Sequence, residues 1–269
     1  MKKYAKSRAK VLDSLDGLSV RVDKKKRIGR LTLDRPPLNV ISYAGRRQIN
    51  AIFEEFGRDD DVGVVVIRGA GGVFTSGGNV AEFPDIERDG MADLAWNVAA
   101  PERCPKPVIC AIEKYAMGAG FELAMACDFR LATKETVLAL PEITIGMMPG
   151  SGGTHRVARV AGLTRAKDMI MLGRRIPAPE ALEWGLLTRV VEDAKAMDKA
   201  VDAMVAHLGA LPPLALKTVK RVLNSAYEMG TQAGLEIEGQ GFEKLRDSWD
   251  YKEGIRAFLG KRKPRFRGR

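Results

Sequence analysis

Alternating and periodic apolar positions divide the chain into a strand-rich first part and a helix-rich last part. LSVRVD and RIGRLTLD alternate apolar and polar residues and predict a β-hairpin that ends at the turn-rich RPPLN. VGVVVIRGA is a continuous β-branched run bounded by glycine, which is typical of a strand covered on both faces. Between them, Ile49, Ile52, Phe53 and Phe56 recur at helical spacing within residues 43–56. The chain therefore begins as strand, strand, helix, strand.

The same kind of unit then recurs around glycine-rich turns. GAGGVFTSGGN follows the buried strand and leads into a helical segment near Val80. PVICAIEKYA predicts a second buried strand, GAG a turn, and FELAMACD a short helix. DFRLATKETVLAL predicts two further strands, and LPEITIGMMPGSGGTHRVARVAG a loop followed by a helix. Repeated strand, turn and helix with mostly parallel strands indicate an α/β fold.

After about Pro177 the pattern becomes helical. LLTRVVE predicts one last strand, and amphipathic periodicity predicts helices over residues 194–207, 214–227, 235–245 and 251–259. We expect a core with the active site and a helical region packed on that core or on a neighbouring subunit. The expected divisions are a basic N-terminal tail (1–17), the core (18–192) and a helical C-terminal region with a basic tail (193–269).

Composition narrows the classes of protein. An apolar content of 45% with 29% charged residues is that of an ordinary globular protein. No run approaches the ~18 apolar residues of a membrane helix, and the N-terminus lacks a signal-peptide pattern, so we expect a cytoplasmic location and no membrane partner. Cys104, Cys110 and Cys127 form no CxxC pair and predict buried, reduced thiols. With two histidines in the chain, we expect no metal site.

The net charge of +10 is concentrated at the two ends of the chain. Eleven of the 44 basic residues lie within residues 1–10 and 261–269, which contain no acid, and the remaining 33 balance 34 acidic residues. Such tails suit an anionic small ligand or a nucleic acid. No interleaving of aromatic and basic residues accompanies them, so we do not expect a nucleic-acid partner.

The glycine turns do not complete a familiar phosphate-binding motif. GAG at residues 118–120 is followed by FEL instead of the spacing GxGxxG, and GGN at residues 77–79 lacks the lysine of a P-loop. No GxSxG motif is present. Each turn follows a buried strand and enters a helix, so converging N–H groups could form an oxyanion hole. For either turn alone, the alternative is that its glycines only allow a tight turn between strand and helix.

Two glutamates stand in apolar surroundings. Glu122 lies within YAMGAGFELAMACDF, and Glu142 follows a proline in LALPEITIGMMPG. Burial can separate the pKa values of two such carboxyl groups, so that one takes a proton from water while the other delivers one to carbon. Either glutamate alone could be structural, Glu122 at a helix N-terminus and Glu142 in a solvated turn. Together with both glycine turns, they favour acid–base chemistry.

FTSGGNV, KPVICAIEKYAMGAGFELAMACD, LPEITIGMMPGSGGTHR and the closing FLGKRKPRFRGR resemble, in order, motifs of the crotonase (enoyl-CoA hydratase/isomerase) superfamily. The resemblance extends from about Leu18 to Arg269. It implies a crotonase-like ββα spiral core with a C-terminal helical region, assembled as a homotrimer or a dimer of trimers. It also implies an acyl-CoA thioester substrate and no cofactor, because coenzyme A is part of the substrate.

The resemblance also implies roles for particular residues. The backbone N–H groups of Gly78 and Ala119 would form the oxyanion hole, Glu122 and Glu142 would hold and activate water, and Gly150 would help to position that water. The substrate-binding residues would be Gly78, Asn79, Val80, Ala119, Phe258 and Lys261, with Phe258 and Lys261 near the adenine and 3′-phosphate of CoA, often from a neighbouring subunit.

Several positions depart from the family pattern. Ala119 replaces the more usual glycine, Asn79 a common aspartate, and His155 a usual glutamine; we interpret His155 as a structural polar residue. RPPLNVIS is one residue shorter than the standard hydratase loop, so the identity of the acyl group that the substrate carries is left open.

The expected activity is the reversible hydration of a 2-enoyl-CoA to the 3-hydroxyacyl-CoA. The alternatives are an enoyl-CoA isomerase, an acyl-CoA lyase or a ring hydrolase of the same superfamily. An RNA-binding member of the superfamily is the alternative from another class, because the tails are basic.

Overall fold

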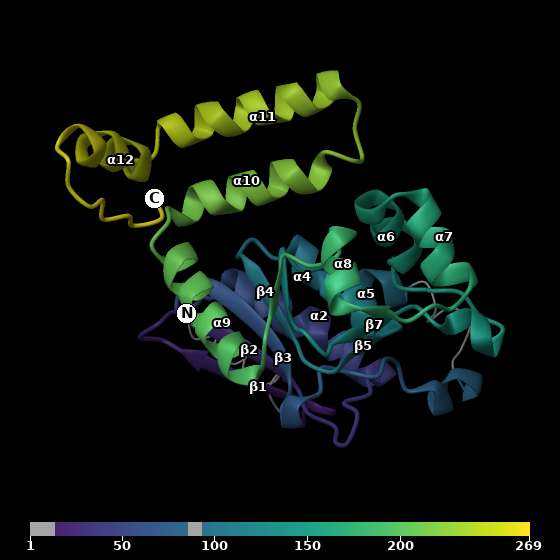
Figure 1. Cartoon of the computed structure of the whole chain (residues 1–269). Helices are drawn as coiled ribbons and strands as arrows, with labels where there is room; N and C mark the ends of the chain where they lie inside the picture. The colour runs from purple at the N-terminus through teal and green to yellow at the C-terminus, as the bar shows by residue number, and fades with distance from the viewer. Residues whose placement is uncertain (1–13, 86–92) are drawn as a thin grey trace.

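Two β-sheets form the centre of the computed structural model, which describes residues 14–85 and 93–269 (Figure 1). The larger sheet has six strands in the order β1 (Leu18–Asp23), β2 (Ile28–Leu33), β3 (Val64–Gly69), β4 (Val108–Ile112), β6 (Phe129–Thr133) and β9 (Arg189–Val191). β1 and β2 form the predicted antiparallel hairpin, and the other neighbouring pairs are parallel. The smaller sheet has the order β5 (Tyr115–Met117), β7 (Val137–Ala139) and β8 (Ile176–Pro177). The predicted basic tail of residues 1–17 lies largely outside the described residues.

The middle strands of the larger sheet are buried on both faces, which explains the uninterrupted apolar run of β3. Successive side chains of a strand point to opposite faces. Val65 and Ile67 therefore join one apolar cluster with α2 (Tyr43–Arg58) and α5 (Ala119–Met125). Val64 and Val66 join a second cluster with α9 (Ala194–Gly209).

Short helices connect the strands, and one of them, α8 (Ala178–Glu183), packs on the smaller sheet. The others are α3 (Asp93–Val98), α4 (Ala100–Arg103), α6 (Gly153–Ala161) and α7 (Leu163–Met171), with the 3₁₀ turns η1 (Ala70–Gly72), η2 (Val80–Asp85) and η4 (Glu142–Ile145). None of α3, α4, α7 and α8 was predicted. Gly162, with φ of 83°, ends α6 and begins α7, so the predicted helix after the GGTHR segment is followed directly by a second.

The four predicted C-terminal helices are confirmed as α9, α10 (Pro213–Ser225), α11 (Thr231–Arg246) and α12 (Trp249–Leu259). α10 and α11 lie side by side as an arm, and α12 follows α11 at the end of the arm where α10 begins (Figure 1). The buried side chain of Lys220 joins α10 to the core. Its Nζ donates to the carbonyl oxygens of Pro101 (2.8 Å) and Lys106 (3.1 Å) and pairs with Asp128 at 2.7 Å.

PVICAIEKYA is two strands in different sheets, and the prediction of one strand was wrong. Lys114 adopts φ of 58° between β4 and β5, so the chain turns out of the larger sheet and continues in the smaller one. Glu113 is buried before this turn and forms an ion pair with Arg68 at 3.3 Å. The turn directs β5 toward the glycine turn of residues 118–120.

The cysteine prediction is confirmed: Cys104, Cys110 and Cys127 are buried and free. Burial raises the pKa of Cys110 well above its ordinary value. Within the two described ranges, no helix combines the length and the apolar character required to cross a bilayer.

Candidate active site

Helix α5 carries Glu122 into the core. All seven residues of this helix are buried, and Glu122 is 1% exposed. Gly118 caps the helix with φ of 50°, a conformation that glycine adopts readily. Gly120 allows a close approach, because a Cβ added there would lie 2.1 Å from Cγ2 of Thr75. The GAG turn therefore places a short helix, and its carboxylate, where bulkier residues would not fit.

Two backbone donors hold the carboxylate of Glu122. Its Oε1 accepts from the N–H groups of Ser151 (2.7 Å) and Gly153 (2.8 Å), in the loop that enters α6. Burial raises the pKa of Glu122, whereas these two N–H groups and the charge of Arg46 favour the carboxylate form. A Cβ at Gly153 would lie 3.0 Å from Oε1 of Glu122, so glycine leaves room for this contact.

Glu142 reaches the same place from η4. Its Oε1 would lie 3.0 Å from a Cβ added to Gly118, which places the carboxyl group against the N-terminus of α5. Its Oε2 is enclosed and has no hydrogen-bond partner within the described part of the chain. Burial is the main cause that raises the pKa of Glu142 to about 7; the charge of Glu122 acts in the same direction, and the backbone N–H of Glu142 opposes both. This carboxyl group can therefore exchange a proton near neutral pH.

Two backbone N–H groups face the same cavity. Ile41 donates to the carbonyl of Gly77 (2.8 Å) and accepts from Asn79 (3.0 Å), so the N–H of Gly78 points away from this pairing. Ala119 is the first residue of α5, where no carbonyl of the helix can accept its N–H. Gly78, Ala119 and both glutamates line one cavity of about 210 Å³. This arrangement can hold a carbonyl oxygen at one wall and exchange protons at another.

The other predicted site residues are divided between this cavity and other places. Gly150 and Val80 line the cavity. Asn79 does not; its Nδ2 donates to Oε1 of Glu82 at 2.7 Å. Phe258 and Lys261 lie at the end of α12, away from α5 (Figure 1), and Phe258 is 82% exposed. The structure of one chain thus brings together the predicted chemical groups but not the predicted contacts with CoA.

Sequence reasoning missed three participants. Ser151 and Gly153 act through backbone N–H groups, which no residue pattern reveals. Arg46 lines the cavity and is 4% exposed. The sequence does carry a signal for Arg46, because this residue lies three residues before Ile49 on the apolar face of the predicted helix. A charged residue on the apolar face of a helix indicates a candidate functional group.

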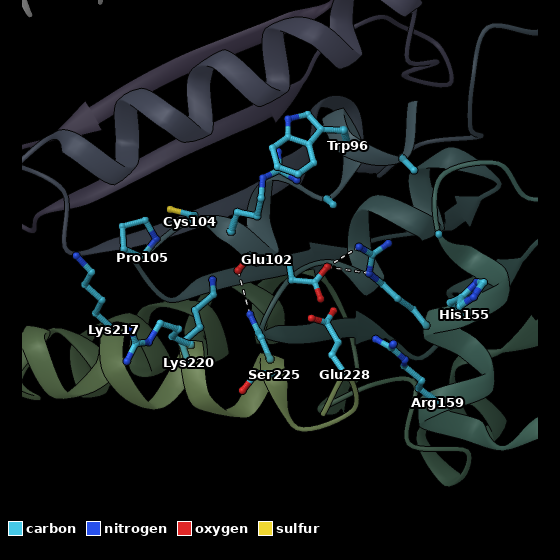
Figure 2. Close-up of a pocket in the computed structure, with 17 residues that line it drawn as sticks. Trp96, Glu102, Cys104, Pro105, His155, Arg159, Lys217, Lys220, Ser225 and Glu228 are labelled. Atoms are coloured by element: carbon cyan, nitrogen blue, oxygen red, sulfur yellow. Dashed lines mark hydrogen bonds and ion pairs between the residues drawn. The ribbon is translucent and has the colours of Figure 1, made fainter. Parts of the chain in front are cut away.

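A larger cavity of about 820 Å³ lies where α10 faces α3, α4 and α6 (Figure 2). His155, an exposed residue, lines this cavity and not the site of Glu122, and its interpretation as a structural polar residue stays a prediction. Glu102 is engaged there by the guanidinium of Arg156, and its carbonyl accepts from Asn224 at 3.0 Å. The cavity in Figure 2 is thus a junction between the arm and the core. Among residues 14–85 and 93–269, no group of three or more His, Cys, Asp or Glu side chains is placed to share a metal ion.

The chain is similar in sequence and in fold to known proteins. The profile of the enoyl-CoA hydratase/isomerase family matches residues 23–269. The chain is 36% identical over 253 residues to a probable enoyl-CoA hydratase of Rhizobium meliloti, covering 92% of this chain and 97% of that protein. A probable enoyl-CoA hydratase of Bacillus subtilis is 32% identical over 259 residues, covering 94% of this chain and 100% of that protein. The crystal structure of an enoyl-CoA hydratase from Bacillus anthracis superposes with a TM-score of 0.88 at 30% identity, covering 94% of this chain and 100% of that one.

The chain therefore belongs to the enoyl-CoA hydratase/isomerase family of the crotonase superfamily. The predicted resemblance and the crotonase-like α/β fold are both confirmed.

Proposed function

We propose that this protein catalyses the reversible addition of water to a 2-enoyl-CoA thioester, giving the 3-hydroxyacyl-CoA. One observation carries the proposal: Glu122 and Glu142 line the same cavity as Gly78 and Ala119, whose N–H groups are available to a ligand. The thioester oxygen would accept from both N–H groups, which would stabilise the enolate formed when water adds at the β-carbon. Both glutamates would hold that water.

The two carboxyl groups differ in a way that supports different roles. Glu142, with its pKa raised to about 7, is proposed to deliver the proton to the α-carbon. Glu122, whose carboxylate is held by two N–H groups, is proposed to take the proton from the attacking water. Gly150 lines the cavity beside them and is proposed to help position the water.

Water addition changes no oxidation state of the protein and needs no electron carrier, so the proposed reaction uses no cofactor beyond the CoA of the substrate. Phe258 and Lys261 are proposed to contact that CoA in an assembly, because neither reaches the cavity of its own chain. A homotrimer or a dimer of trimers is proposed as the oligomeric state. Its support is the exposed apolar residues of the arm, which include Leu223, Leu235 and Phe242. The cytoplasmic location stays a prediction.

The test replaces each glutamate by its uncharged isostere. Glu122→Gln and Glu142→Gln should each lower kcat/KM for hydration by at least ~10²-fold, because each removes one proton-transfer step. Affinity for a saturated acyl-CoA should stay nearly unchanged. Hydration is followed as loss of absorbance at the conjugated thioester band, with crotonyl-CoA and longer or cyclic enoyl-CoAs as substrates.

Glu183→Gln is the matched control, because Glu183 is exposed at the end of α8. Equal hydration by the wild type and both site variants would refute the assigned roles. Conversion of 3-enoyl-CoA to 2-enoyl-CoA without hydration would favour an isomerase, which uses the same oxyanion hole.

A further inference from the structure

Arg46 is a buried cation that no described residue engages by a hydrogen bond or an ion pair. It lies in the first turn of α2, 4% exposed, and lines the cavity of Glu122 and Glu142. Its Nε is enclosed without a hydrogen bond, and no ion pair to its guanidinium is found within residues 14–85 and 93–269. The contact it makes is with the ring of Tyr43, whose centroid lies 5.2 Å from Cζ.

Two other cations, the buried Lys220 and the half-buried Arg130, behave differently. Arg130 donates to the carbonyl oxygens of Leu186 (2.8 Å) and Cys127 (2.6 Å), and Lys220 has the three acceptors described above. Both are structural, because their donors are satisfied by the fold. Arginine stays protonated when buried, so the unpaired charge of Arg46 is costly in the free protein.

The nearby carboxylates do not neutralise this charge by contact. Glu122, Glu82 and Glu142 influence Arg46 electrostatically, but none lies within ion-pair distance. Glu82 is already engaged by the side chain of Asn79 and by the backbone N–H of Tyr43. The donors of Arg46 are therefore available to a ligand.

The guanidinium lies next to the position proposed for the thioester. A Cβ added to Gly78 would be 2.3 Å from Nη2 of Arg46. The lining nearby is apolar and comes from several elements; it includes Val80, Phe83, Leu94, Ile145 and Met147. A cavity of about 210 Å³ is smaller than most small-molecule sites, so it suits a short acyl group.

We propose that Arg46 binds a carboxylate on the acyl chain of the substrate, so that the preferred substrate is a short enoyl-CoA whose chain ends in a carboxylate. This inference rests on the proposed hydration and names its substrate class. The planar guanidinium can donate two parallel hydrogen bonds to a carboxylate, which a neutral chain end cannot accept in the same way. Without Arg46, an anionic chain end would meet mainly the negative charge shared by the two glutamates.

Two other roles for Arg46 make a different prediction. A guanidinium that only favours the ionised glutamates, or only assists the thioester oxygen, would act equally on charged and neutral acyl chains. A guanidinium that binds the chain end would change the ratio between them. The ratio of matched substrates is therefore the decisive measurement.

The experiment compares 2-pentenedioyl-CoA with 2-pentenoyl-CoA, and 2-hexenedioyl-CoA with 2-hexenoyl-CoA. The wild type should show a kcat/KM about 10- to 100-fold higher for the carboxylated member of at least one pair. Arg46→Met should remove this preference or reverse it, and Arg46→Lys should keep part of it. Arg47→Met is the control, because Arg47 is the exposed neighbour on the same helix, and it should leave the ratio unchanged.

Binding of saturated pentanedioyl-CoA and pentanoyl-CoA, measured by calorimetry, separates this inference from the proposed function. A preference for the carboxylated ligand that Arg46→Met removes would support the role of Arg46 even if no substrate were hydrated. Equal or weaker use of the carboxylated compounds by the wild type would overturn it, whether or not Arg46→Met folds. An Arg46→Met variant that folds and keeps the wild-type ratio would overturn it as well.

Discussion

Replacement of Glu142 by glutamine should stabilise the folded protein at alkaline pH while it removes activity. The carboxyl group is half-buried, and its enclosed Oε2 has no hydrogen-bond partner among the described residues. When the group ionises, the folded state must hold a poorly solvated charge beside Glu122. Glutamine has nearly the same shape and stays neutral, so the variant avoids this cost.

The magnitude and its pH window follow from the pKa of Glu142. The pKa is about 7 in the folded protein against an ordinary value of 4.5. The folded state therefore binds the proton more tightly, and its stability falls as pH rises from about 4.5 through about 7. The full difference corresponds to at most about 3.4 kcal/mol. Because the group is partly exposed to the cavity, we expect screening to reduce the gain of Glu142→Gln to about 1–2 kcal/mol above pH 7.

Urea unfolding at about pH 5 and pH 8, at one protein concentration, measures the effect. Glu142→Gln should raise the midpoint clearly at the higher pH and much less at the lower one. The control Glu183→Gln should change both midpoints equally. A gain for Glu142→Gln that is the same at both pH values, or a loss at the higher one, would refute the reasoning.

Three other perturbations test the site and its support. The pH profile of kcat/KM should be bell-shaped and have the same shape for hydration and dehydration, because both active forms carry one proton on the glutamate pair. Its alkaline limb should lie near pH 7, where Glu142 loses its proton. Steady-state rates that stay constant between about pH 6 and 9 would contradict this prediction. Gly78→Ala should lower kcat/KM for the neutral 2-pentenoyl-CoA by about 10²-fold, because its Cβ would collide with Nη2 of Arg46. Arg46→Ala in the same chain should recover part of this loss in steady-state assays with that substrate, and equal losses in the single and double variants would argue against the collision. Lys220→Met should lower the free energy of unfolding by about 3 kcal/mol, because Asp128 would lose its buried partner. Adding Asp128→Asn should recover part of this loss, and an unchanged urea midpoint for Lys220→Met would show that the pair does not hold α10 on the core.

Local patterns predicted the elements that depend on local periodicity. The spacing of Ile49, Ile52 and Phe53 identified α2, and the β-branched run of residues 64–67 identified β3, because burial on one helix face or on two sheet faces leaves a direct trace. The division at Lys114 was not predictable in this way. It depends on which sheet the chain joins after the turn, and this is determined by pairing with strands that are distant in the sequence.

The same distinction applies to the site. Glu122 and Glu142 were recognisable because a carboxylate among apolar residues is unusual at any single position. The backbone donors of Ser151 and Gly153 were not, because every residue except proline carries an N–H and only the folded loop aims it. The exposed positions of Phe258 and Lys261 were not predictable either, because they depend on where α12 lies relative to the core.

The two glutamates belong to structural elements of different kinds, and this difference affects how members of the family can acquire new substrates. Glu122 is part of a fully buried helix, where nearly every substitution would disturb packing. Glu142 begins a surface turn followed by exposed residues such as Ile143, Ile145 and Met148. Evolution or directed selection can therefore vary the exposed residues Ile143, Ile145 and Met148 at little risk to folding, whereas Gly146, with φ of 76°, is restricted. Changes in acyl preference should accumulate at those exposed positions while α5 stays constant.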